Sequence, residues 1–326
     1  MATMNAAVVT SFAEPPRYQE FDVPRPRTAD EMVVDVLAVG LHPRVRSGAA
    51  GAHYTSTGTL PMIPGIDAVG QRPDGRRIYF LAADDVIGTM ADKSLASARR
   101  SIELPADADV AKIAAAMNPA MSSWVALRRR VRLEPGQSVL VLGATGNAGA
   151  MAVQVARRLG AGRVVGAGRD AGRLQALTSA GADDAVELTG DAGATGKALA
   201  AAAAESDIVL DYLWGKPAQQ AILALLTARS DRGRALDWIQ IGAVAGPTIE
   251  LPSVALRSAN FRLQGSGQGA VSAETYLAEL PVLAGEITTG TIAVKANTVP
   301  LADVEEAWTR AEVPGERTVL LPQARA

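Results

Sequence analysis

The sequence contains no cysteine and only two histidines, His42 and His53, and these shortages exclude several kinds of site. A chain without cysteine forms no disulfide, thiolate zinc site or iron–sulfur cluster, and it offers no cysteine nucleophile. Two histidines are too few to build a histidine metal site on their own. We therefore expect no metal centre in this protein.

The sequence also lacks the charge pattern and the long apolar runs that nucleic-acid and membrane proteins need. Its net charge is −2 and 20% of its residues are charged, so no basic field is available to attract a nucleic acid. No apolar run approaches the roughly 20 residues that span a bilayer. Residues 1–12 do not have the pattern of a secretory signal. We expect a cytoplasmic protein with neither a nucleic-acid nor a membrane partner.

The chain is long enough for two domains, each with its own core, because it has 326 residues of which 48% are hydrophobic. Residues 4–120 are expected to be rich in strands, and the final 60 residues mix helices and strands. Between residues 137 and about 261 strands and helices alternate, which predicts a parallel sheet with helices on both faces. The expected strands are 138–142, 163–167, 184–188, 207–211 and 236–242, and the expected helices include 147–159, 172–180, 194–204 and 217–227.

This pattern predicts two domains, with the α/β domain inserted into a β-rich one. Residues 1–120 plus 262–326 are expected to form a β-rich catalytic domain, and residues 121–261 a Rossmann nucleotide-binding domain. Two helices, 108–117 and 121–130, are expected to be separated by a break at Asn118-Pro119. Ligands of open α/β sheets bind at the carboxyl ends of the strands, so we expect the substrate in the cleft between the domains.

A glycine-rich loop follows the strand expected at 138–142. Gly143, Gly146 and Gly149 have the spacing G-x-x-G-x-x-G and lead directly into an amphipathic helix. Glycine allows a sharp turn, a close approach to a pyrophosphate and tight packing of helix on strand, and the helix N-terminus favours phosphate. The residues expected to contact the cofactor here are Gly143, Thr145, Gly146, Asn147, Ala148 and Gly149.

The second strand of the unit, 163–167, is followed by Gly168-Arg169-Asp170, where the adenosine ribose of a dinucleotide would lie. Arg169 and Arg173 are suited to a 2′-phosphate, which predicts NADP(H) rather than NAD. Asp170 would instead bind a ribose hydroxyl if the strand ended one residue later. The two arginines also fit a solvated helix start.

In the order and spacing of several motifs, the chain resembles the zinc-independent medium-chain dehydrogenases/reductases, the quinone oxidoreductase-like family. The resemblance covers nearly the whole chain. It implies a Rossmann sheet inserted into a β-rich (GroES-like) catalytic domain, and a homodimer formed through the nucleotide domain. The motifs are Met4–Val9, Leu60–Gly65, Pro135–Val141, the glycine loop, Leu177–Asp183, Asp207–Asp211, Ile241–Ala243 and Pro300–Trp308.

The resemblance implies hydride transfer without a metal ion. Zinc-dependent relatives carry Gly-His-Glu where this chain reads Gly65-Ile66-Asp67, and their cysteine ligands are missing. A quinone or an α,β-unsaturated carbonyl can accept hydride from NADPH without a Lewis acid, because the developing enolate needs only hydrogen-bond donors and later a proton. The partner that this implies is a small-molecule carbonyl substrate.

The family's substrate-side residues carry over unevenly. Its Leu-Asn-Pro loop reads Leu41-His42-Pro43 here, and its cleft tyrosine is best matched by Tyr54. We expect His42 and Tyr54 to orient the carbonyl oxygen of the substrate. The alternative for His42 is a loop histidine that is paired to backbone.

Three further residues are expected near the nicotinamide. Ser122 matches the family's threonine before the crossover helix, although it also fits a helix cap. Gly242 follows a strand and is expected to let the nicotinamide approach the backbone. Tyr212 ends a strand at the ligand edge of the sheet, where it stacks on cofactor or substrate or else packs in the core.

A second function stays open at this point. The altered Leu41-His42-Pro43 loop and the lack of an indispensable acid or base also fit an NADPH-binding sensor or regulatory protein. Such a protein would keep the reductase fold without significant turnover. Cofactor binding without oxidation by any enone or quinone would favour it.

Overall fold

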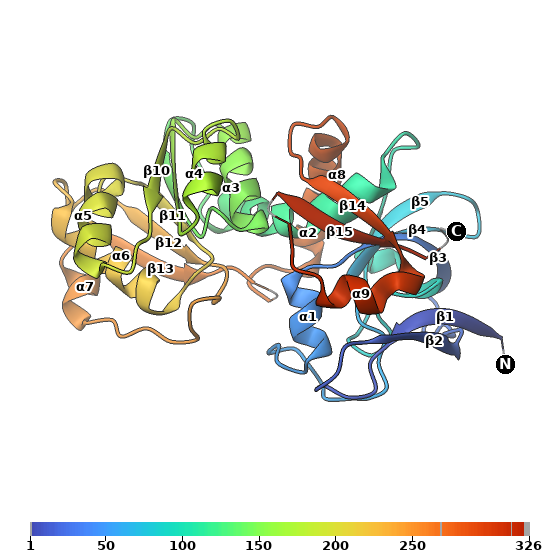
Figure 1. Ribbon diagram of the computed structural model, residues 1–326. Coiled ribbons are helices and arrows are strands. Elements are labelled where there is room, and N and C mark those ends of the chain that lie inside the picture. Colours follow the sequence, from blue (N-terminus) through green and yellow to red (C-terminus); the bar gives the residue numbers. More distant parts are fainter. Residues whose placement is uncertain (1, 268, 314, 323–326) are drawn as a thin grey trace. The chain divides into compact units, whose positions relative to one another are not determined.

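The computed structural model describes residues 2–267, 269–313 and 315–322. It divides the chain into two units, each described here by itself: unit 1 comprises residues 1–118 and 273–326, and unit 2 comprises residues 119–272. The expected α/β fold class, with a parallel Rossmann-type sheet and a separate β-rich part, is confirmed (Figure 1). Among the described residues, no helix combines the length and the apolar character needed to cross a membrane.

Unit 2 is built on a six-stranded parallel sheet in the order β10-β9-β8-β11-β12-β13. The order reverses between β8 and β11, which is the point where ligands of such sheets bind. Helices α3 and α4 cover one face, and α5 and α6 cover the other (Figure 1). The strands are β8 (Ser138–Leu142), β9 (Arg163–Gly168), β10 (Asp184–Glu187), β11 (Ile208–Asp211), β12 (Leu236–Gln240) and β13 (Phe261–Gly265). The helices are α3 (Asn147–Arg158), α4 (Ala171–Leu177), α5 (Ala192–Ala203), α6 (Gly215–Ala228) and α7 (Ser253–Arg257).

The strands of this sheet form because their side chains are buried on both faces. Val139, Leu140 and Val141 are fully buried, as a strand between two helical layers requires. Leu142 pairs in register with Ala167 and with Asp211, so the strands end side by side. The loops that follow β8, β9 and β11 therefore start at one edge of the sheet.

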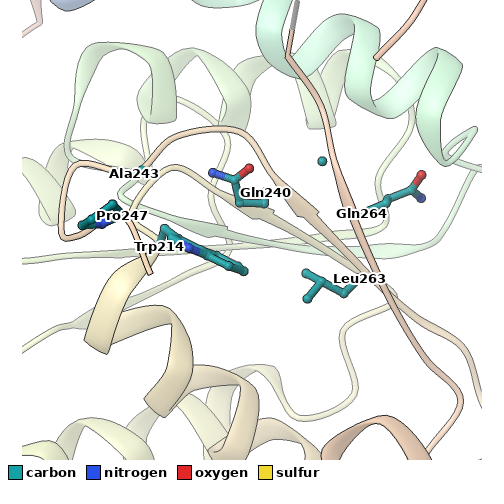
Figure 2. Close-up of a pocket in the computed structure, with 7 residues that line it drawn as sticks. Trp214, Gln240, Ala243, Pro247, Leu263 and Gln264 are labelled. Atoms are coloured by element: carbon teal, nitrogen blue, oxygen red, sulfur yellow. The ribbon is translucent and has the colours of Figure 1, made fainter. Parts of the chain in front are cut away.

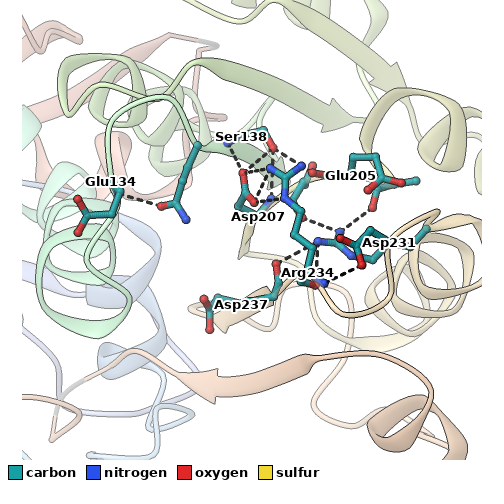
Figure 3. A network of polar contacts seen from close by, with 12 residues as sticks. Glu134, Ser138, Glu205, Asp207, Asp231, Arg234 and Asp237 are labelled. Atoms are coloured by element: carbon teal, nitrogen blue, oxygen red, sulfur yellow. Dashed lines mark hydrogen bonds and ion pairs between the residues drawn. The ribbon is translucent and has the colours of Figure 1, made fainter.

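A polar network fixes the opposite ends of the strands, where the strands begin (Figure 3). The Asp207 carboxylate accepts hydrogen bonds from the Ser138 backbone N at 2.8 Å and from Arg234 Nε and Nη2 at 2.7 Å each. A two-pronged arginine–carboxylate contact is stronger and more directional than a single bond. This network holds the start of β8 beside the start of β11. The carboxyl ends of the strands are left for a ligand.

Unit 1 contains the N-terminal strands and the C-terminal end of the described chain. A seven-stranded sheet has the order β14-β15-β3-β4-β5-β7, with β6 also paired to β3, and β1 and β2 form a separate pair. β15 pairs antiparallel with β3, so the C-terminal segment completes this unit. The strands are β1 (Thr3–Val8), β2 (Arg17–Asp22), β3 (Glu31–Gly40), β4 (Asp67–Gln71), β5 (Arg77–Leu81), β6 (Lys93–Ser97), β7 (Ser101–Glu103), β14 (Lys295–Pro300) and β15 (Glu316–Leu321). The helices are α1 (Pro43–Ala49), α8 (Ala273–Thr288) and α9 (Val304–Thr309).

The expected helix break at Asn118-Pro119 was wrong. Helix α2 runs from Val110 to Val125 with Pro119 inside it, and a π-helical turn, Ala126–Arg130, continues it. Proline removes one backbone hydrogen bond from a helix interior. Here the helix is buried on both sides of the proline, with Met117 and Ala120 fully buried, and this burial outweighs the lost bond.

The compact units end at different residues from the expected domains. β13 pairs with β12 along its whole length and therefore lies in the sheet of unit 2, beyond the boundary expected at residue 261. The strand carries no continuous apolar run, because Arg262 and Gln264 alternate with Phe261 and Leu263. The assignment of catalytic and nucleotide-binding roles to the two parts stays a prediction.

Candidate functional site

The glycine loop after β8 has the geometry that a phosphate-binding turn needs. Gly143 has a φ of +86°, which a residue with a side chain adopts only with strain. A Cβ added to Gly149 would lie 2.2 Å from the Gly143 carbonyl oxygen. Helix α3 is thus packed directly on the loop, and only glycine fits at both positions.

The N-terminus of α3 has no capping side chain. Its N-cap is Gly146, so no side chain accepts from the first N–H groups of the helix. The next two helices differ, because Asp170 caps α4 and Asp191 caps α5 through their carboxylates. Uncapped N–H groups at a helix N-terminus form a natural anion site. The residues of this loop therefore fit the pyrophosphate of a dinucleotide, and Asn147 and Ala148 lie in the first turn of the helix.

The end of β9 separates the roles of the two charged residues that follow it. Asp170 is the N-cap of α4, and its Oδ1 accepts from the Arg173 backbone N at 3.0 Å. Arg173 lies 3.4 Å from the same carboxylate through Nε, and its Nη1 donates to the Thr145 carbonyl at 2.8 Å. Arg169 is exposed and has no hydrogen-bond or ion-pair partner in the described part of the chain. Asp170 is thus engaged as a helix cap, and Arg173 is engaged through Nε and Nη1 but not through Nη2. Arg169 is the cation without a partner in the described part of the chain.

Ser122 and Tyr212 are brought together in unit 2. Ser122 Oγ lies 3.0 Å from the Tyr212 hydroxyl and donates to the Pro119 carbonyl at 2.8 Å. Burial raises the pKa of the Tyr212 phenol to about 12, against a smaller opposing effect of its serine partners. Ser122 lies inside α2, so its alternative reading as a helix cap was wrong. A neutral phenol is thus held at the carboxyl end of β11.

The turn after β11 is held in a strained conformation by Asp211. Trp214 has a φ of +54°, which is unusual for a bulky residue. The buried Asp211 carboxylate accepts from the Leu213 and Trp214 backbone N atoms at 2.8 and 2.9 Å and from Trp238 Nε1 at 3.0 Å. Burial raises the pKa of Asp211, and these donors oppose that shift.

Trp214 lines a pocket of about 320 Å³ beside the ends of β12 and β13 (Figure 2). Figure 2 shows the indole between Pro247 and Leu263, with Gln240 and Gln264 as the polar groups of the wall. The pocket lies wholly within unit 2. The remaining lining residues are Ala243 and Gly265.

A backbone contact that the sequence did not reveal requires glycine at position 242. A Cβ at this position would lie 2.6 Å from the Tyr212 carbonyl oxygen. Its backbone N also donates to the Asp211 carbonyl at 3.1 Å. Contact with the neighbouring loop therefore already requires glycine here, and a role beside the nicotinamide stays a prediction.

In unit 1, His42 is a buried member of a side-chain network, with 3% of its surface exposed. Its Nε2 lies 3.0 Å from Asp67 Oδ1, and the Tyr79 hydroxyl donates to Asp67 Oδ2 at 2.8 Å. The expected alternative, pairing of His42 to backbone, was wrong. The other ring nitrogen, Nδ1, is buried and has no partner among the described residues. Asp67 therefore orients the ring and leaves Nδ1 as its unpaired nitrogen.

Tyr54 lies on an exposed segment, with 73% of its surface accessible, so it is not a core residue. Its ring packs against His53 with centroids 4.2 Å apart. The Thr55 hydroxyl accepts from Arg44 Nη2 at 2.7 Å and lies 2.9 Å from His53 Nδ1, which also accepts from the Thr55 backbone N at 3.2 Å. Since Nδ1 accepts, His53 carries its proton on Nε2.

The structure groups the expected residues within each unit. The glycine loop, Arg173 and the Ser122–Tyr212 pair meet at one edge of the unit 2 sheet, where a Cβ on Gly143 would lie 3.3 Å from Tyr212 Cβ. His42 and Tyr54 belong to unit 1. Sequence reasoning did not single out Asp67, the partner of His42, or Arg44, the partner of Thr55. A charged residue that opens an apolar strand was the available signal for Asp67.

The described residues contain no group of three or more His, Cys, Asp or Glu side chains placed to hold a metal ion. The expected absence of a metal site stays a prediction. His42, which lies in the loop beside α1, has a carboxylate rather than a second imidazole as its neighbour.

Comparison with known proteins gives no matching family model. The sequence is 30% identical to a probable NADPH-dependent quinone reductase, tdiC, of Emericella nidulans, over 98% of this chain and 100% of that protein. It is 25% identical to the 2-methylene-furan-3-one reductase of Solanum lycopersicum, over 49% of this chain and 45% of that protein.

Among solved structures, the quinone oxidoreductase of Thermus thermophilus, which was also solved in complex with NADPH, matches with a TM-score of 0.78. The match covers 98% of this chain and 100% of that chain at 25% sequence identity. The similarity in sequence and in fold extends over both units.

Proposed function

The chain belongs to the quinone oxidoreductase family of the medium-chain dehydrogenases/reductases, and from this we propose that it uses NADPH to reduce a quinone or an α,β-unsaturated carbonyl. It is an oxidoreductase of small molecules. The relatives' names include a quinone reductase and a reductase of 2-methylene-furan-3-one, which is an enone. We therefore propose both acceptor classes, quinones and enones or alkenals.

The observation that supports the cofactor assignment is the difference in contacts between the two charged residues after β9. Asp170 is committed to the N-cap of α4, so its carboxylate is not free for a ribose diol. Arg169 directly precedes it and is a free cation among the described residues. Both facts favour a 2′-phosphate at this position and therefore NADP(H).

The residues of unit 2 hold the cofactor in this proposal. The first N–H groups of α3 bind the pyrophosphate, and Arg169 and Arg173 bind the 2′-phosphate. The Ser122–Tyr212 pair and Gly242 lie at the neighbouring strand ends, where they place the nicotinamide. When bound, NADPH supplies the hydride.

The residues of unit 1 act on the carbonyl acceptor. We assign His42 and Tyr54 to the carbonyl oxygen, where negative charge develops as hydride arrives. Tyr54 offers an exposed hydroxyl donor. Asp67 holds Nε2 of His42, so Nδ1 is the ring nitrogen left for the acceptor.

Metal-free catalysis is part of the proposal and rests on the donor set. The chain has no cysteine, and one of its two histidines is buried against Asp67. A conjugated acceptor fits this set, because its reduction needs hydrogen-bond donors and a proton rather than a Lewis acid. We further propose a homodimer and a cytoplasmic location, in line with the expectations from the sequence.

The first experiment separates turnover from binding alone. The purified protein is mixed with NADPH or NADH, and absorbance at the nicotinamide band is followed with a benzoquinone, a 2-alkenal and a cyclic enone. We expect NADPH oxidation by at least one acceptor, with NADH the poorer donor. Tight NADPH binding with no oxidation by any acceptor would instead favour the sensor function.

A further inference from the structure

Arg44 is a half-buried cation without an acidic partner. It lies in the first turn of α1, and its only side-chain hydrogen bond among the described residues is the one from Nη2 to Thr55. No ion pair joins it to an Asp or Glu in this part of the chain. Burial lowers the pKa of Arg44, yet a guanidinium keeps its proton in proteins. A half-buried positive charge is thus left without a counter-ion among the described residues.

The nearest carboxylates are already engaged by other donors. Asp67 accepts from His42 and Tyr79. Asp85 accepts from the Thr57 backbone N at 2.6 Å and from the Thr57 hydroxyl at 3.1 Å. Both carboxylates act on Arg44 only through longer-range attraction. The remaining donors of Arg44 therefore have no anion within the described protein.

The surroundings of Arg44 fix its position beside the expected substrate-binding tyrosine. The Thr55 hydroxyl accepts from Arg44 and donates to His53 Nδ1, which ties α1 to the segment that carries Tyr54. Arg44 and Tyr54 are close enough to interact electrostatically. His53 adds no second charge, because burial and the nearby Arg44 lower the pKa of its imidazole to about 4.

We propose that Arg44 is an anion subsite that binds a carboxylate carried by the carbonyl acceptor. The guanidinium offers a planar fork of donors that matches a carboxylate, and a half-buried fork binds it more strongly than an exposed one. This inference rests on the proposed reductase function and narrows its substrate class. The acceptor is then an anionic quinone or enone whose carboxylate lies apart from the reducible bond.

The test compares one acceptor in two charge states. An enone whose alkyl chain ends in a carboxylate, and the methyl ester of the same enone, are assayed with wild-type protein and with Arg44→Gln, Arg44→Lys and Arg25→Gln. Arg25 is an exposed arginine of unit 1 and controls for net charge. For Arg44→Gln we expect kcat/KM for the carboxylate to fall about 10- to 100-fold, with the ester changed less than about 3-fold. Arg44→Lys should keep part of the preference, and Arg25→Gln all of it.

A second readout does not depend on turnover. Wild-type protein is modified with phenylglyoxal, and the rate at Arg44 is measured by peptide mass spectrometry in the presence of the saturated keto acid product or its ester. We expect the keto acid, and not the ester, to protect Arg44. This arm keeps the test valid if Arg44→Gln does not fold.

Two results would overturn the subsite. If kcat/KM fell equally for the carboxylate and for the ester, Arg44 would act on the carbonyl oxygen or would only stabilise the fold. If the affinity for NADPH fell by the same factor, Arg44 would act at the cofactor. If neither enone nor quinone is reduced, the proposed function fails, and protection by the keto acid then decides on Arg44 alone.

Discussion

At the end of β9, an arginine and an aspartate are adjacent in the sequence but differ in their contacts. Arg169 is the first residue after the strand and is unpaired among the described residues, whereas Asp170 caps α4. Replacing Arg169 with Ala should therefore weaken NADPH binding about 10- to 100-fold and change NADH binding less than about 3-fold. Fluorescence titration with each cofactor measures both.

The control for this prediction is Arg163→Ala. Arg163 is an exposed arginine at the opposite end of the same strand, where it pairs with Asp184 at 3.2 Å. Its removal changes the net charge of unit 2 equally and should leave the preference for NADPH intact. Equal weakening of NADPH and NADH by Arg169→Ala would contradict the assignment of the 2′-phosphate.

His53 is predicted to stay neutral throughout the physiological range. Burial, with the nearby Arg44 as the second cause, lowers its pKa from 6.5 to about 4 in the folded protein. Between these values the unfolded chain binds more protons than the folded one, so this group's contribution to stability is complete above pH 6.5 and is lost as pH falls toward about 4. Proton NMR should place the midpoint of His53 near 4, and Arg44→Gln should raise it. A wild-type midpoint near 6.5 would contradict the contact network around Thr55.

At the scale of elements, the loop between β8 and α3 depends on the absence of a side chain at Gly149. An alanine there would place its Cβ 2.2 Å from the Gly143 carbonyl oxygen, so the loop or the helix must shift. We expect Gly149→Ala to weaken NADPH binding about 10-fold or more, because the first N–H groups of α3 would no longer point at the pyrophosphate. Equilibrium binding titration measures the loss.

Gly196→Ala is the matched control. Gly196 lies inside α5, and a Cβ there would meet Ala224 at an ordinary 3.7 Å. This substitution should leave NADPH binding unchanged and should stabilise the protein by about 0.5–1 kcal/mol, as urea unfolding would show. Unchanged binding in Gly149→Ala would mean that the helix does not position the cofactor.

The elements that sequence analysis predicted best are those with one dominant local signal. β8 was placed at its observed bounds, because five largely apolar residues lead into a glycine turn. The break at Pro119 was wrong, since a local rule about proline gave way to burial of the surrounding helix. β13 was missed, because pairing with β12 rather than its own pattern makes it a strand.

The site was predictable where the chemistry is local and not where partners are distant in sequence. The glycine loop and Arg169 directly follow β8 and β9, so spacing was enough to place them there, and their roles at the cofactor stay predictions. The partner of His42 is 25 residues away, and the contact that requires Gly242 comes from Tyr212. These contacts depend on the position of β4, which carries Asp67, and of β11, which precedes Tyr212. A local sequence pattern does not predict such positions.

At the scale of the whole molecule, the edges of the unit 2 sheet bear on the predicted homodimer. β10 and β13 are its edge strands, and an edge strand presents unpaired backbone groups. Sedimentation equilibrium should give twice the mass of the 33.7 kDa chain. A monomer at all protein concentrations would refute the dimer.

The placement of the histidines has a consequence for the chemical stability of the protein toward the proposed quinone and enone substrates. Quinones and enones alkylate soft nucleophiles, cysteine thiolates above all, and this chain has none. The imidazoles come next. His42 is buried against Asp67, and Nδ1 of His53 is occupied by Thr55. Intact-mass spectrometry after prolonged incubation with a reactive enone should show no histidine adduct. Thr55→Ala removes the hydroxyl contact to His53 Nδ1 at 2.9 Å and keeps the backbone N–H contact at 3.2 Å, so it should raise the rate of His53 alkylation. If quinones or enones are its substrates, as proposed, we expect this chain to resist alkylation by them at its histidines.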